Sequence, residues 1–332
     1  MTTDIPTLDL HEWRSADTAA RARICAALDT ALRQTGMFLL AGHDVPIELT
    51  RRMRSTGLAF MRLPSEQKRR YAVRGPYDNG WRELGTMQAS ALDGVDGGGA
   101  MSMSDAPDLH EAYHMGPSHR TGDDRFDRLY YPANRWPGEV PDLRETAVAY
   151  SGEMTRIALT VLEVLAETLG LDADYFTRRS QRATWTQNIN WYPSLSSLGG
   201  VEEGQMRVGP HTDFGTITLL DRQQGVGGLE AWNEEDGWFR PPFEPGTLVV
   251  NLGDMMNQWT DGRWRALRHR VQAPPGSDPD EELVSLVYFF ESDPDTLVEP
   301  LPAPIGGGAG MQPGIAGETI LEKCGVTLTL TD

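Results

Sequence analysis

Apolar and polar positions follow two different periods along the chain. In residues 15–36 and 141–170 apolar side chains recur every three or four positions, which predicts two long helices. Pro46 and Pro64 are typical first-turn residues and predict a helix to about residue 62 and a short helix after it. Residues 5–10, 37–40 and 111–116 are apolar enough for short strands.

After Phe176 the pattern changes to short strand-like runs separated by Gly, Pro and Asp turn signals. These runs are residues 185–191, 205–211, 216–220, 229–232, 238–240, 247–251, 266–272 and 284–290. Many short strands with regular turns indicate two packed antiparallel sheets. We therefore expect a mainly β protein with flanking helices and a double-stranded β-helix (jelly-roll) core.

The pattern contains no sharp linker and no internal repeat, so we expect one domain over residues 1–332. Residues 1–176 would form a mostly helical region packed on the barrel, residues 177–300 the jelly-roll core, and residues 301–332 a tail. Residues 73–106 are rich in glycine and poor in apolar side chains. This stretch could cover an active site, but we favour a solvated insertion.

Composition narrows the class of protein. The 332 residues carry a net charge of −18, which argues against nucleic acid and anionic membrane surfaces as partners. The chain has only 2 cysteines, no signal-peptide pattern at its start and no apolar run of transmembrane length. We expect a cytoplasmic protein, monomeric or weakly homo-oligomeric, that acts on a small molecule.

The candidate chemistry centres on His211 and Asp213, which are one residue apart. On a β-strand they would point to the same face. His269 follows a turn at Asp261 and Gly262, on a strand that could lie opposite residues 209–213. Two histidines and one carboxylate are the facial triad of non-haem Fe(II) oxygenases, although Zn(II) also accepts these ligands. A zinc hydrolase or a non-catalytic metal-binding protein is therefore an alternative.

Several further motifs accompany these three residues. They are residues 210–220 (PHTDFGTITLL), 251–254 (NLGD), 260–263 (TDGR), 269–271 (HRV) and 190–193 (NWYP). Together they resemble the isopenicillin N synthase-like family of non-haem Fe(II) oxygenases, over nearly the whole chain. Most members of that family depend on 2-oxoglutarate.

The resemblance implies Fe(II) bound by His211, Asp213 and His269, with O2 and 2-oxoglutarate as co-substrates. It also implies hydroxylation, desaturation or ring formation on a small molecule, and we expect that molecule to be a secondary metabolite. Asn190, Tyr192 and Ser285 would line the co-substrate pocket. No catalytic side chain beyond the three metal ligands is predicted.

One position departs from the family pattern. An Arg-x-Ser pair usually binds the distal carboxylate of 2-oxoglutarate, and Ser285 matches its serine, which places Leu283 at the arginine. Leucine cannot replace a charged bidentate donor. Three explanations remain open: another arginine (Arg207, Arg182 or Arg268) binds the carboxylate, the protein is an Fe(II) oxidase that needs no 2-oxoglutarate, or activity has been lost.

Overall fold

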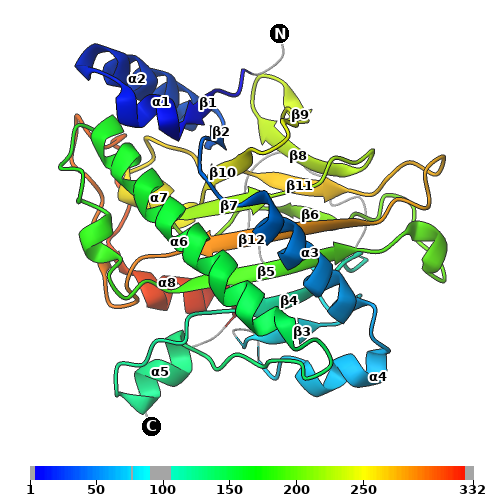
Figure 1. Cartoon of the computed structure of the whole chain (residues 1–332). Helices are drawn as coiled ribbons and strands as arrows, with labels where there is room; N and C mark the ends of the chain where they lie inside the picture. Colours follow the sequence, from blue (N-terminus) through cyan, green and yellow to red (C-terminus); the bar gives the residue numbers. More distant parts are fainter. Residues whose placement is uncertain (1–3, 76–77, 90–105, 326–332) are drawn as a thin grey trace.

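Two β-sheets form the centre of the computed structural model, which describes residues 4–75, 78–89 and 106–325 (Figure 1). The larger sheet has eight strands in the order β1 (Thr7–Asp9), β2 (Met37–Ala41), β10 (Leu248–Leu252), β7 (Ile217–Asp221), β12 (Leu283–Phe290), β5 (Trp185–Tyr192), β4 (Glu111–Met115), β3 (Gly80–Arg82). The smaller sheet has four strands in the order β6 (Val208–His211), β11 (His269–Gln272), β8 (Gly228–Asn233), β9 (Gly237–Phe239). A short pair, β13 (Leu297–Val298) and β14 (Gly314–Ile315), lies apart from both. Apart from the parallel pair β1–β2, neighbouring strands are antiparallel, and the jelly-roll prediction is confirmed.

Helices flank the sheets. They are α1 (Leu10–Ser15), α2 (Thr18–Gln34), α3 (Ile47–Met61), α4 (Ser65–Lys68), α5 (Asp124–Tyr130), α6 (Asp142–Thr168), α7 (Asp254–Trp259) and α8 (Ala316–Lys323), with 3-10 turns at Arg69–Tyr71, Thr177–Arg179 and Leu195–Ser197. The long helix predicted over residues 15–36 is in fact preceded by α1 and begins only after Asp17. The Asp17 side chain accepts a hydrogen bond from the Ala20 amide and so caps a new helix.

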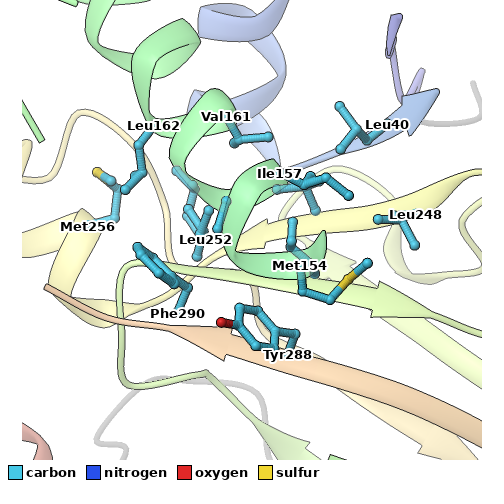
Figure 2. Packing of buried hydrophobic residues seen from close by; sticks show 14 of the residues in the cluster. Leu40, Met154, Ile157, Val161, Leu162, Leu248, Leu252, Met256, Tyr288 and Phe290 are labelled. Carbon is cyan, nitrogen blue, oxygen red and sulfur yellow. The ribbon is translucent and has the colours of Figure 1, made fainter. Parts of the chain in front are cut away.

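The main core lies between α6 and the larger sheet. Figure 1 shows α6 crossing the face of this sheet with α3 beside it. Met154, Ile157 and Val161 of α6 and Tyr288 and Phe290 of β12 belong to one apolar cluster, in which Met154 lies beside Tyr288 and Ile157 toward Leu40 (Figure 2). All five side chains are buried, so α6 holds the sheet from outside the barrel.

Strand β2 is buried on both faces. Phe38 and Leu40 belong to the core under α6, whereas Met37 and Leu39 belong to a second apolar cluster with Leu229 of the smaller sheet. Alternate side chains of one strand therefore contact different layers. This strand joins the helical layer to the space between the two sheets.

The predicted insertion at 73–106 is described only at its ends. Residues 76–77 and 90–105, which include its glycine run, lie outside the described residues. Within the described part the expectation of loop is wrong at β3, where buried Trp81 pairs with Tyr113 of β4. None of the described helices has both the length and the apolar character that crossing a membrane requires.

Candidate metal centre and co-substrate pocket

His211, Asp213 and His269 come together at one end of the smaller sheet. His211 is the last residue of β6 and pairs with His269, the first residue of β11. The two strands are adjacent and antiparallel, as expected. The predicted strand over residues 205–211 ends where β6 ends, and Asp213 lies in the loop that follows, so the two ligands do not share a strand.

The loop that carries Asp213 is held by the start of α7. The backbone amide of Asp254 donates to the Asp213 carbonyl at 2.8 Å. Gly253 packs so closely that a Cβ atom there would lie 2.5 Å from the Gly215 carbonyl oxygen. This contact allows the carboxylate to turn back toward the histidines.

The three side chains form a compact set of donor atoms. Asp213 Oδ1 lies 3.7 Å from His211 Nε2 and 3.9 Å from His269 Nε2. One ligand atom from each residue lies within 4.8 Å of the others, and no other such group of three was found among the described residues. These separations suit a single ion bound between two nitrogens and one oxygen.

Hydrogen bonds orient every member of the set. His211 Nδ1 lies 2.8 Å from the Gly209 carbonyl and His269 Nδ1 lies 3.1 Å from the Leu267 carbonyl. Each Nδ1–H donates to its carbonyl, which leaves the Nε2 lone pair for a metal. Asp213 Oδ2 accepts from Thr218 Oγ1 at 2.5 Å and from Asn251 Nδ2 at 2.7 Å.

The electrostatics favour the protonation states that bind metals. Burial lowers the pKa of His211, and the neighbouring His269 lowers it further. Burial alone would raise the pKa of Asp213, but both histidines and the hydrogen bonds from Thr218 and Asn251 together lower it. Neutral imidazoles and an ionised carboxylate are the forms that a divalent ion requires.

A cavity of about 220 Å³ lies beside these residues, and all three line its wall. The predicted co-substrate residues Asn190, Tyr192 and Ser285 also line it, as does Leu283. In the pairing of β5 with β12, Leu283 lies opposite Tyr192 and Ser285 opposite Asn190, so all four share one face. Burial raises the pKa of the Tyr192 hydroxyl, and hydrogen bonding with Asn190 and Ser285 partly offsets the rise.

None of the three arginines suggested as replacements for Leu283 lines this cavity. Arg207 is buried against the Tyr192 ring, with its guanidinium carbon 5.4 Å from the ring centroid and Nη1 2.6 Å from Glu281 Oε1. Arg182 pairs at 2.8 Å with Asp295 on the surface. The Arg268 guanidinium lies 5.8 Å from the Trp238 ring centroid.

Two arginines that the sequence analysis did not consider line the cavity instead, Arg222 and Arg240. Thr218 and Asn251, which hold Asp213, were also overlooked. Arg222 directly follows β7 and continues the alternation of Thr218 and Leu220, which was the signal that could have identified the first arginine.

Comparison with protein-family models yields two matches. Residues 5–139 match the N-terminal region of the non-haem dioxygenases of morphine synthesis, and residues 189–292 match the 2OG-Fe(II) oxygenase superfamily.

Individual proteins agree with these models. Validamycin A dioxygenase of Streptomyces hygroscopicus subsp. limoneus is 62% identical over 323 residues, covering 97% of this chain and 86% of the relative. Homoarginine-6-hydroxylase 2-ODD-C23 of Glycine max is 29% identical over 280 residues, covering 82% of this chain and 79% of the relative. Among solved structures, full-length Neurospora crassa T7H in complex with alpha-KG and thymine has the same fold, with a TM-score of 0.80, 22% identity and coverage of 97% of this chain and 96% of that one.

The resemblance inferred from the motifs is thus confirmed. The relatives do not favour an oxidase independent of 2-oxoglutarate. The family uses Fe(II), O2 and 2-oxoglutarate, and the donor set of two imidazoles and a carboxylate fits that iron. The chain belongs to the 2OG-Fe(II) oxygenase superfamily and is a 2-oxoglutarate-dependent dioxygenase of secondary metabolism.

Proposed function

We propose that this enzyme oxidises validamycin A or a closely related molecule, with Fe(II) bound by His211, Asp213 and His269. The observation that carries the proposal is the 62% identity to validamycin A dioxygenase over 97% of the chain.

The residues of the chain position the reactants. His211 and His269 would each give an Nε2 lone pair, and Asp213 one carboxylate oxygen, while Thr218 and Asn251 hold that carboxylate in place. When bound, Fe(II) and 2-oxoglutarate supply the oxidising power, since 2-oxoglutarate and O2 give succinate and CO2 as a C–H bond of the substrate is oxidised. The hydroxyls of Tyr192 and Ser285 and the amide of Asn190 would bind the co-substrate in the cavity.

The test is a turnover assay with validamycin A, Fe(II), 2-oxoglutarate and O2. We expect succinate in proportion to a product detected by mass spectrometry. A gain of one oxygen atom identifies hydroxylation, and a loss of two hydrogens identifies desaturation or ring closure. Succinate formation that does not respond to validamycin A or its precursors would contradict the proposed substrate.

The metal ligands are tested separately. We expect His211→Ala and Asp213→Ala to lose Fe(II) binding and turnover, because an open site with only two protein ligands binds the ion weakly. Full activity in either variant would refute the assignment of that ligand.

We further infer that the chain acts in the cytoplasm as one domain, monomeric or weakly homo-oligomeric. Cys25 and Cys324 are both free thiols, which suits a reducing compartment. Gel filtration of the purified enzyme measures its oligomeric state.

A further inference from the structure

The co-substrate pocket of the proposed function lacks a charged group at Leu283, the usual position for one. A buried carboxylate without a cationic partner is costly, so the distal carboxylate of 2-oxoglutarate needs another cation. We propose that Arg222, the residue directly after the neighbouring strand β7, binds the distal carboxylate of 2-oxoglutarate in place of an arginine at position 283. The inference rests on the proposed function, whose pocket it completes.

Strand register brings Arg222 to this place. In the antiparallel pairing of β12 with β7, Leu286 lies opposite Asp221 and Val287 opposite Leu220. Continuing the register by one residue puts Arg222 opposite Ser285. Both side chains line the cavity, and so do Thr218 and Leu220 of β7, the strand that ends one residue before Arg222.

The charge of Arg222 is not neutralised by the described part of the chain, where no ion pair includes it. Its Nη2 donates to the carbonyls of Pro241 at 3.0 Å and Pro242 at 2.6 Å, and its guanidinium carbon lies 5.7 Å from the Phe243 ring centroid. These contacts fix the side chain without balancing its charge. Burial lowers the pKa of Arg222 to about 10, as expected for a buried cation without an anionic partner.

The other arginines near the pocket already have carboxylate partners. Arg240, which also lines the cavity, lies 3.4 Å from Glu230 and is half exposed. Arg207 is paired with Glu281. Arg222 is thus the cavity-lining arginine without a carboxylate in the described residues.

Arg222 and the candidate iron ligands lie in different parts of the same cavity wall. Thr218, whose hydroxyl contacts Asp213, precedes Arg222 by four residues, which is about 13 Å between Cα atoms in extended chain. Arg222 therefore stands apart from the metal ligands, on the side where the end of 2-oxoglutarate that does not bind the metal would lie.

The experiment compares Arg222→Met with Arg240→Met as a matched control. 2-Oxoglutarate is titrated anaerobically into each Fe(II)-loaded protein, and the visible charge-transfer band reports binding without turnover. We expect the Kd of Arg222→Met to rise roughly 10- to 100-fold, equal to about 1.4–2.7 kcal/mol, and that of Arg240→Met to change less than about twofold. Arg222→Lys, which keeps the charge but not the planar fork, should lie between these values.

Two further measurements separate the loss of a carboxylate contact from a general disturbance. 2-Oxovalerate, which lacks the distal carboxylate, should bind Arg222→Met as well as it binds the wild type. The double variant Arg222→Met/Leu283→Arg should regain most of the affinity for 2-oxoglutarate, because it restores an arginine next to Ser285.

Several results would overturn the inference. An unchanged Kd in Arg222→Met, or an equal loss of affinity for 2-oxovalerate, removes Arg222 from the binding of the distal carboxylate. If Arg222→Met does not fold, two other results together also remove Arg222 from the binding of the distal carboxylate. They are an unchanged Kd in Arg222→Lys and no gain of affinity for 2-oxoglutarate in Leu283→Arg. Absence of the band in the wild type overturns the co-substrate site of the proposed function itself, and the role of Arg222 with it.

Discussion

Thr218 offers a sharp test of how the protein prepares Asp213 to bind metal. Its hydroxyl donates to Asp213 Oδ2 at 2.5 Å, and both side chains are buried. Thr218→Val keeps the shape of the side chain and removes only the donor. The carboxylate then retains the single bond from Asn251 at 2.7 Å.

The expected loss follows from the charge of the acceptor. A hydrogen bond to an ionised group contributes about 1.5–3 kcal/mol, and residues that orient a metal ligand typically change metal affinity 10- to 100-fold. Because the Asn251 amide remains, we expect the low end, about tenfold weaker Fe(II) binding. The loss should be similar at pH 6 and pH 8, because the pKa of Asp213 is lowered from its ordinary value and the carboxylate is ionised at both.

Metal affinity is measured anaerobically by competition with a chromophoric chelator. Thr216→Val is the control, because Thr216 is equally buried but its hydroxyl donates to the Phe290 carbonyl instead. We expect the control to lose stability and keep its metal affinity. Adding Asn251→Leu to Thr218→Val should weaken binding by more than the two single effects combined, because Oδ2 would then be buried without a donor. Unchanged affinity in Thr218→Val at both pH values would refute this account of Asp213.

Three other changes test the surroundings of the site. Gly253→Ala should lower the stability of the protein by about 1–3 kcal/mol and also lower its metal affinity, because the new Cβ would lie 2.5 Å from the Gly215 carbonyl oxygen. A calorimetric measurement in which either quantity is unchanged would contradict this. Burial raises the pKa of Glu291 to about 8, so the folded state holds a proton that the unfolded state releases above about pH 4.5, and stability should fall as pH rises toward 8. Glu291→Gln should flatten that fall in thermal denaturation of the metal-free protein, and parallel pH profiles would disprove the idea. Ile157→Ala should cost about 2–5 kcal/mol in urea denaturation yet leave Fe(II) affinity intact, since Ile157 packs between α6 and the sheet; a matching loss of metal affinity would argue against separate roles.

Much of the fold follows from side-chain periodicity, and the failures have physical causes. Each predicted strand after residue 176 overlaps an observed one, because buried and exposed positions alternate or the run is wholly apolar. Helix α7, which follows the Asn-Leu-Gly-Asp motif, was not predicted. Its six residues complete fewer than two turns, too few for a helical period to appear in the sequence.

The site was predictable where it depends on local spacing. His211, Asp213 and His269 stand in motifs that the chain shows directly. The position of Arg222 depends on which strand lies beside β12, and that pairing joins residues more than sixty positions apart. A search limited to the segment around Leu283 therefore could not find it.

Strand β2 is buried on both faces, and this affects how the chain folds during its synthesis. Its partner β10 is synthesised roughly 200 residues later, which at 5–20 residues per second is about 10–40 s of translation. During that time Met37, Phe38, Leu39 and Leu40 have an open edge and two apolar faces. A nascent chain in this interval exposes an aggregation-prone apolar strand near its N-terminus. Production at lower temperature or with added chaperones should therefore increase the yield of folded enzyme.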